Sequence, residues 1–442
     1  MPNDAKRVAE NKLNERGIEF EYGFIPRFVI SGKKVEFNTI SEAASTCSSL
    51  QYDYRALNVF FRTGMFLGDT TPFREIRRIS PPPWIIPADE YLTRDQAIRA
   101  YIECFRDAVQ ARAREHTILG LSGGRDSRHI AFELTRTPYK PDYAVTIDLE
   151  SVNDAEIARH ICNALGIEHQ VVASTKESPE AHLWRNRKTN LLSLQHLWVV
   201  SFSRQRDRRW WWDGIGGDVL SAGLFLDQWK LELFRSNRLE ELANKLVAAG
   251  RVSLFPDQSK FCRDEAVDEV LKELRLHSKA ANPVGSFYFW NRTRIDIASS
   301  AFALLGLNGK RTLAPYLDKE VYRLLASLPA EYFIDYQFHT DAINLAFPEY
   351  RDIPYSTRKT TRPERRPLLS YFQEVANGTL ESTYAGKAWL LLHGLWGLVS
   401  RDRKSALGWR RAHALYLKSL DEIRAIPNDA VNITRPTVLE ET

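Results

Sequence analysis

Short apolar runs alternate with amphipathic stretches through the middle of the chain. The runs predict strands at residues 117–121, 143–147, 170–173 and 209–212. Between the strands, apolar positions recur every three or four residues and predict helices at residues 96–115, 127–135 and 154–165. Gly166 stands where the last of these helices needs a C-cap. Alternating strands and helices favour an α/β fold built on a doubly wound parallel sheet.

The regions on either side of this alternation have different patterns. Residues 1–90 mix short β-like runs at 28–30 and 35–37 with a helical pattern at 52–64, and a rigid proline run at 81–83 stands near their end. Residues 220–354 and the tail beyond 362 are mostly helical in pattern. We therefore predict a small N-terminal α+β region over 1–90, a central domain over 91–362 and a helical C-terminal extension over 363–442.

The loop after the first predicted strand, residues 122–127, reads Ser-Gly-Gly-Arg-Asp-Ser. Gly123 and Gly124 allow a tight turn that brings backbone N–H groups close to phosphate oxygens at a helix N-terminus. Ser122 and Ser127 add hydroxyl donors. Asp126 would repel a bare phosphate and therefore indicates a bridging divalent cation such as Mg²⁺. The loop lacks the GxxxxGK[ST] pattern of a Walker A loop, and an ordinary capped Gly-Gly turn is the simpler alternative.

A second glycine loop follows the fourth predicted strand and reads Asp-Gly-Ile-Gly-Gly-Asp over residues 213–218. Ligands of open parallel sheets bind at the carboxyl ends of the strands, where both loops fall. Asp126 and Asp218 would stand at neighbouring strand ends and could share one Mg²⁺ bound to ATP. His129, in the first turn of the helix after the first loop, is interpreted as a structural or solvated group.

These motifs together resemble a known family. The first loop is similar to the SGGxDS loop of the N-type ATP pyrophosphatases, the PP-loop superfamily, which split ATP into AMP and pyrophosphate. The whole set resembles the synthetase domain of the asparagine synthetase family, which carries SGGxDS, SGEGxDE and then PFLDxxVxxxxxxLP. The matching segments are residues 73–81, 122–127, 213–218, 315–321, 328–329, 353–354 and 358–359. The resemblance covers residues 52–362 and implies a PP-loop fold for the central domain.

The resemblance implies a role for each matching residue. ATP or its pyrophosphate would be bound by Leu121, Ser122, Gly123, Gly124, Asp126, Ser127, Val145, Thr146 and Gly214. Within this set Leu121, Val145 and Thr146 would line the adenine pocket. Gly214 would lie beside the α-phosphate. Asp126 and Asp218 would be the Mg²⁺ ligands, and Lys359 would stabilise the charge of the transition state. The implied catalytic set is Lys359, Asp126 and Asp218, with ATP and Mg²⁺ as cofactors.

The resemblance also implies a reaction. In the family, a substrate carboxylate attacks the α-phosphate of ATP to give an acyl-adenylate, and a nitrogen nucleophile then displaces AMP to form an amide. This chain would be such an AMP- and pyrophosphate-forming ligase, acting on a small-molecule or peptide carboxylate and on an amine or ammonia. Whether a separate protein supplies the ammonia or the substrate stays open.

Three departures from the family pattern bear on this function. Glutamine-hydrolysing members begin with a catalytic cysteine after Met removal. Here Pro2 takes that position and residues 1–90 are too few for a glutaminase domain, so we expect no glutamine hydrolysis. The glutamate of SGEG, regarded as a general base, is replaced by Ile215, which cannot take a proton. The serine of that motif is Asp213 and its final glutamate is Val219. Ring-closing relatives that form β-lactams carry tyrosine in place of that glutamate, so they do not match either.

Composition leaves two alternatives open. A net charge of +5 over 442 residues does not by itself imply a nucleic-acid partner. A tRNA-modifying ATP pyrophosphatase remains an alternative, although the second loop and the 315–321 segment argue against it. The other alternative is a non-catalytic ATP-binding relative.

Four widely spaced cysteines and the lack of a signal peptide predict free thiols in a reducing cytoplasm. The longest apolar run, 388–399, is shorter than the roughly 20 residues of a membrane span.

Overall fold

The computed structural model describes residues 25–79, 82–88, 92–149, 152–174, 178–194, 197, 200–203, 209–248, 260–297, 312–357 and 403–430. A five-stranded sheet lies at its centre, with the strand order β6-β5-β4-β7-β8. Every neighbouring pair of these strands is parallel. The strands are β4 (Thr117–Gly120), β5 (Tyr143–Asp148), β6 (His169–Ala173), β7 (Trp210–Trp212) and β8 (Thr312–Leu313). The predicted α/β fold with a doubly wound parallel sheet is thereby confirmed.

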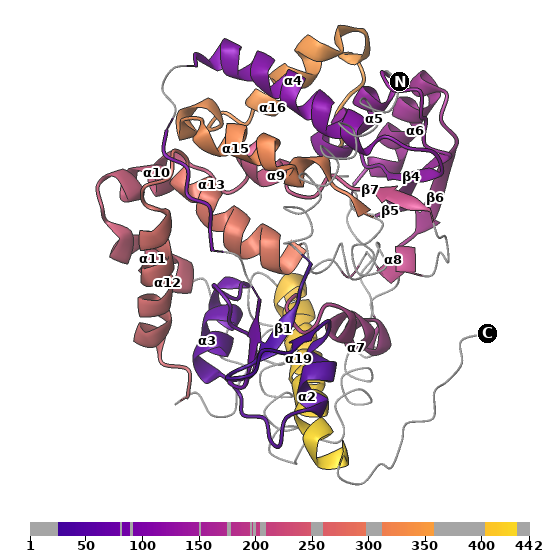
Figure 1. Ribbon diagram of the computed structural model, residues 1–442. Helices are drawn as coiled ribbons and strands as arrows, with labels where there is room; N and C mark the ends of the chain where they lie inside the picture. The colour runs from indigo at the N-terminus through magenta and orange to yellow at the C-terminus, as the bar shows by residue number, and fades with distance from the viewer. Residues whose placement is uncertain are drawn as a thin grey trace, which may run out of the picture.

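Helices surround this sheet (Figure 1). Helix α4 (Arg94–Arg112) precedes β4, and the helices that follow strands of the sheet are α5 (Arg125–Leu134), α6 (Asp154–Leu165), α7 (Pro179–Lys188), α8 (Val200–Ser203) and α9 (Gly217–Leu220). A further helical group comprises α10 (Gln228–Arg235), α11 (Leu239–Ala248), α12 (Arg263–His277), α13 (Pro283–Tyr288) and the π-helix η4 (Phe289–Ile297). After β8 come α15 (Lys319–Ser327), α16 (Phe338–Ala346) and three short 3₁₀ turns, η5 (Pro315–Leu317), η6 (Ala330–Tyr332) and η7 (Pro348–Tyr350).

The helix ends follow local capping chemistry. Helix α6 has the predicted bounds, and Gly166 ends it in the left-handed conformation at φ 63°. Helix α4 starts two residues before the predicted position because Thr93 and Gln96 form a capping box. In that box the Gln96 N–H donates to the Thr93 hydroxyl, while the Gln96 side chain accepts from the Thr93 N–H. The first turn of α4 therefore gains partners for two otherwise free donors.

The N-terminal region forms a separate antiparallel sheet of order β2-β1-β3. Its elements are β1 (Phe28–Ile30), β2 (Glu36–Phe37), β3 (Ile76–Arg78), α2 (Ile40–Ser45) and α3 (Tyr54–Thr63). Both short β-like runs and the helical pattern at 52–64 correspond to elements of this α+β unit. Strand β3 lies in the 73–81 segment that matches the family, and its pairing with β1 makes that segment part of the unit.

The C-terminal helix α19 (Arg403–Ala430) packs on this N-terminal unit, beside α2 and α7 (Figure 1). Tyr416 is fully buried there, with its ring centroid 5.2 Å from that of Phe60, and Phe60 stacks on Phe66 at 4.3 Å. The Tyr416 hydroxyl donates to the carbonyl of Leu191 at 2.6 Å. The first and last described parts of the chain therefore share one apolar core. The boundaries at residues 90 and 362 stay predictions.

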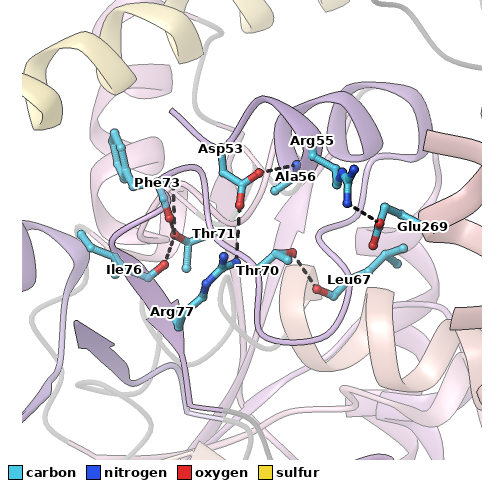
Figure 2. A network of polar contacts seen from close by, with 10 residues as sticks. All are labelled: Asp53, Arg55, Ala56, Leu67, Thr70, Thr71, Phe73, Ile76, Arg77 and Glu269. Atoms are coloured by element: carbon cyan, nitrogen blue, oxygen red, sulfur yellow. Dashed lines mark hydrogen bonds and ion pairs between the residues drawn. The ribbon is translucent and has the colours of Figure 1, made fainter. Parts of the chain in front are cut away.

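Polar contacts hold the N-terminal unit together and connect it to the helical group (Figure 2). Asp53 caps α3 by accepting from the N–H of Ala56 at 3.0 Å, and its other oxygen lies 3.4 Å from Arg77. Arg55 pairs with Glu269 of α12 at 3.2 Å, but the Arg55 side chain is 56% exposed. An exposed ion pair contributes little, about 0–1 kcal/mol. Apolar packing also connects the two parts, because Val59 of α3 lies in the same buried cluster as Val267 and Val270 of α12.

Two further features bear on the composition-based expectations. Cys47, Cys104, Cys162 and Cys262 are all free thiols. Among the described residues, no helix has the length and apolarity required to cross a bilayer. The apolar run 388–399 lies outside the described residues.

Candidate active site

Both glycine loops emerge where the strand order reverses. Strand β4 pairs with β5 on one side and with β7 on the other, so the chain changes direction across the sheet at β4. Parallel register places Leu119 beside Trp212, which sends the loops after β4 and β7 out at the same edge. This topological switch point is the place where open α/β sheets bind ligands.

Hydroxyl groups shape the first loop from inside. The Ser127 hydroxyl accepts from the N–H of Ser122 at 3.0 Å, and the Ser122 hydroxyl accepts from the N–H of Gly124 at 3.1 Å. The N–H of Gly123 donates to the Asp154 carboxylate, on the first residue of α6, at 3.0 Å. The two serines and Asp154 therefore hold the turn between β4 and α5 in shape. Asp154 is a member of this site that sequence reasoning missed.

The segment 353–357 lies against the first loop. Arg128 of α5 is buried; it donates to the Ile353 carbonyl at 2.8 Å and stacks 4.0 Å from the Tyr355 ring. The Ser356 N–H donates to the Gly123 carbonyl at 3.1 Å. The Thr357 N–H donates to the Asn153 side chain, next to Asp154, at 2.7 Å. Lys359 itself lies outside the described residues, two positions beyond Thr357.

Gly123 is tightly enclosed by this arrangement, and Gly124 is not. A Cβ at Gly123 would stand 2.6 Å from Cβ of Ser356 and 3.0 Å from Cβ of Ile157. At Gly124 the added atom would meet only the Ser122 hydroxyl, a mobile side-chain end, at 3.1 Å. The first loop and the 353–357 segment therefore approach each other over Gly123, at a distance that only glycine allows.

We predict that Gly123→Ala lowers the thermal unfolding midpoint, because overpacking of this kind costs about 1–3 kcal/mol. Gly124→Ala is the matched control, since Gly124 has φ −75°, which alanine adopts without strain. Differential scanning fluorimetry of both variants without nucleotide measures the effect. Equal midpoints for the two variants would contradict the packing described here.

The second loop packs directly onto Asp126. A Cβ at Gly214 would lie 2.8 Å from Cβ of Asp126, and one at Gly217 would lie 2.6 Å from its Oδ1. Gly216 has φ +91°, a conformation that L side chains rarely adopt. Glycine at 214 and 217 thus allows close approach, whereas glycine at 216 allows the turn itself. The structure brings the two predicted loops into contact.

Asp126 and Asp218 form a pair of carboxylates at this contact. Asp126 is 26% exposed, and its Oδ1 is buried without a hydrogen-bond partner. Burial, followed by the charge of Asp126, raises the pKa of Asp218 to about 6, against a lowering effect of Arg292. An unpartnered buried oxygen and mutually repelling carboxylates are what a bound divalent cation would relieve.

The described residues contain no group of three or more His, Cys, Asp and Glu side chains able to hold a metal. Two carboxylates alone suit Mg²⁺, which binds through one or two carboxylates and takes its other ligands from water and substrate phosphates. The donor set at Asp126 and Asp218 therefore fits a nucleotide-bound Mg²⁺.

A buried histidine pair, which sequence reasoning missed, lies behind Asp126. His129 Nδ1 is 3.2 Å from Nε2 of His339, and both side chains are fully buried. His339 Nδ1 is 3.0 Å from the Ser221 hydroxyl and 3.4 Å from Oδ1 of Asp126. The Ser221 hydroxyl already donates to the Gly217 carbonyl at 2.6 Å, so it accepts from His339. His339 thus presents an N–H toward the two loops.

His129 is structural rather than solvated. Its burial, followed by the proximity of His339, lowers its pKa well below the ordinary value. The Phe105 ring stacks on it at 4.2 Å. His339 lies on α16, 210 positions further along the chain, and no sequence signal connects the two histidines.

The three residues assigned to the adenine pocket are brought together. Leu121 donates its N–H to the Val145 carbonyl at 2.9 Å, and the Thr146 hydroxyl donates to the Leu121 carbonyl at 2.6 Å. His169 Nε2 lies 2.9 Å from that hydroxyl and completes its hydrogen bonds. All three side chains are buried. Their role in adenine binding stays a prediction. In the structure, the Thr146 hydroxyl binds backbone at the edge of the sheet.

Fold and site together define an α/β protein with two glycine loops and paired carboxylates at a switch point. Residues 100–338, more than half of the chain, match the family model of asparagine synthase. The chain therefore belongs to the asparagine synthase family, whose members are ATP-dependent ligases that form carbon–nitrogen bonds. No curated protein matches the chain significantly.

Proposed function

We propose that this protein is an amide ligase that converts ATP to AMP and pyrophosphate by way of an acyl-adenylate. The observation that supports this most is the contact between the two loops, which places Asp126 of the first loop against Gly214 and Gly217 of the second. ATP bound at that contact would have its phosphates beside both carboxylates. Family membership supports the same reaction type.

The side chains of the loops have separate tasks in this proposal. The turn formed by Ser122, Gly123, Gly124 and Ser127 receives the pyrophosphate at the N-terminus of α5, where free helix N–H groups bind anions. Gly214 leaves room for the α-phosphate. Asp126 and Asp218 hold Mg²⁺, which neutralises phosphate charge and orients the leaving pyrophosphate when bound.

The substrates are a carboxylate, small or peptidic, and a nitrogen nucleophile, either ammonia or an amine. Ile215 is buried and apolar, so it contributes no proton transfer to the second half of the reaction. Within the second loop, its side chain belongs to the main apolar core, which gives it a packing role instead. The free thiols are consistent with work in a reducing cytoplasm.

The decisive experiment is exchange of labelled pyrophosphate into ATP, screened across candidate carboxylic acids. We expect exchange that depends on both an acid and Mg²⁺, because adenylation is reversible until the nitrogen nucleophile arrives. A full acid screen without exchange, together with a salt-sensitive complex with tRNA, would favour a tRNA-modifying pyrophosphatase instead.

A further inference from the structure

Amide formation from an acyl-adenylate requires a proton acceptor, and this requirement rests on the proposed function. The nitrogen forms a bond to the acyl carbon, the bond from that carbon to the phosphate oxygen breaks, and AMP leaves with the bonding electrons. The nitrogen must then lose one proton to become a neutral amide. A positioned side chain with a pKa near the working pH performs this transfer best.

Most ionisable groups near the loops are committed elsewhere. Asp126 and Asp218 are assigned to Mg²⁺, and Asp154 accepts from the Gly123 backbone. His129 and His339 are fully buried behind Asp126, where a substrate nitrogen has no access. Among the described residues of the two loops, Asp213 is the remaining carboxylate.

Asp213 is held at the carboxyl end of β7. Its N–H donates to the Leu313 carbonyl of β8 at 3.0 Å, which continues the sheet by one residue. Its Oδ1 accepts from the N–H of Ile215 at 2.9 Å, which orients the carboxylate. In the described part of the chain no hydrogen bond reaches Oδ2. The next residue, Gly214, packs against Asp126, so Asp213 borders the proposed nucleotide site.

The surroundings of Asp213 suit proton transfer better than metal binding. Its pKa is raised to about 6, mainly by burial; the hydrogen bond from the Ile215 N–H lowers this pKa, and the charge of Asp126 raises it. A third metal ligand would need to converge with Asp126 and Asp218, and the described residues contain no such group of three. The side chain keeps partial solvent access, so a captured proton can leave to water.

We propose that Asp213 is the general base of amide formation, accepting through Oδ2 the proton that the attacking nitrogen loses. Oδ1 stays bound to the Ile215 N–H throughout the step. The proton passes to solvent after AMP has left. Asp213 thus acts in the second half-reaction and leaves adenylation to the other residues of the site.

The test separates the two half-reactions in Asp213→Asn. Asparagine keeps the shape and can still accept from the Ile215 N–H, so only the proton acceptor is lost. Pyrophosphate exchange with the acid found by screening measures adenylation. Single-turnover amide formation from the preformed adenylate with ammonium chloride measures the second half. Hydroxylamine, a strong nucleophile that is largely unprotonated at neutral pH, serves as a nitrogen source with little need for a base.

We expect exchange to stay near the unmodified rate while amide formation from ammonia falls about 10²–10⁴-fold, the usual contribution of a positioned base. Hydroxamate formation from hydroxylamine should persist, and Asp213→Glu should recover part of the reaction with ammonia. Asp107→Asn, which removes an exposed carboxylate of α4, should change neither half-reaction.

Two results would overturn the role of Asp213 while leaving the proposed function intact. One is full amide formation from ammonia by Asp213→Asn. The other is an equal loss of exchange, of amide formation and of hydroxamate formation, which would indicate a structural or metal-binding role. Absence of exchange in the unmodified chain would overturn the proposed function, and the role of Asp213 with it.

Discussion

Asp126→Asn and Asp218→Asn are each expected to abolish ATP turnover while leaving the chain folded. Each change removes one of two carboxylate charges that interact with each other, and the proposed Mg²⁺ site then loses an anionic ligand. An amide keeps the shape of the carboxylate, so the close contact of Asp126 with Gly217 is preserved. Formation of AMP and pyrophosphate at saturating Mg²⁺, ATP and substrate measures the effect.

The thermal unfolding midpoint distinguishes this loss of ATP turnover from damage to the fold. Because the charge of Asp126 helps to raise the pKa of Asp218, the two carboxylates repel each other in the ligand-free protein. Neutralising either one should leave the thermal unfolding midpoint in the absence of Mg²⁺ unchanged or higher. In the unmodified chain, Mg²⁺ with pyrophosphate should raise the midpoint, and in both variants this increase should disappear.

Asp264→Asn is the matched control, because that carboxylate is 89% exposed in the first turn of α12. It should retain both turnover and the ligand-induced increase in midpoint. Near-unmodified AMP formation by either loop variant at saturating Mg²⁺ would eliminate the shared-metal site.

The central sheet could be predicted because its strands are short apolar runs set between amphipathic helices. Strand β8 could not, since it consists of only Thr312 and Leu313 and has no periodicity of its own. It exists because Thr312 and Leu313 pair with Trp211 and Trp212. That partnership is a tertiary contact over about one hundred residues, which a local pattern does not contain.

The residues of the site also fall into two groups: those that the local sequence indicates and those that only long-range contacts bring to the site. Residues 122–127 and 213–218 carry their chemistry in the sequence, because glycines and aspartates at strand ends have few other uses. His339 and the 353–357 segment reach the site only through folding. A histidine within α16 has no sequence feature that connects it with Asp126, 213 positions earlier. The packing of α19 on the N-terminal unit is likewise a long-range contact.

Lys359→Met is expected to reduce kcat strongly and to change ATP affinity little. The resemblance assigns Lys359 to charge stabilisation in the transition state, and this assignment remains a proposal. Thr357, two positions before Lys359 in the sequence, is bonded to Asn153 beside the first loop.

Among phosphate oxygens a lysine stays protonated, because nearby negative charge raises its pKa. A permanently charged Lys359 cannot serve as the base for amide formation, which is consistent with our assignment of that role to Asp213. It can stabilise developing charge, and loss of one such donor typically costs about 10²–10³-fold in kcat. Lys359→Met should therefore slow both exchange and amide formation, unlike Asp213→Asn.

The measurement combines equilibrium binding of ATP with single-turnover release of AMP in the same preparation of Lys359→Met. Lys272→Met is the control, since the Lys272 side chain is 63% exposed on α12 and pairs only with Glu269 among the described residues. If Lys359→Met lost ATP affinity in proportion to its loss of AMP-release rate, Lys359 would bind the ground state rather than the transition state. Full turnover by Lys359→Met would remove this residue from the catalytic set, leaving Asp126, Asp218 and Asp213 to carry the chemistry.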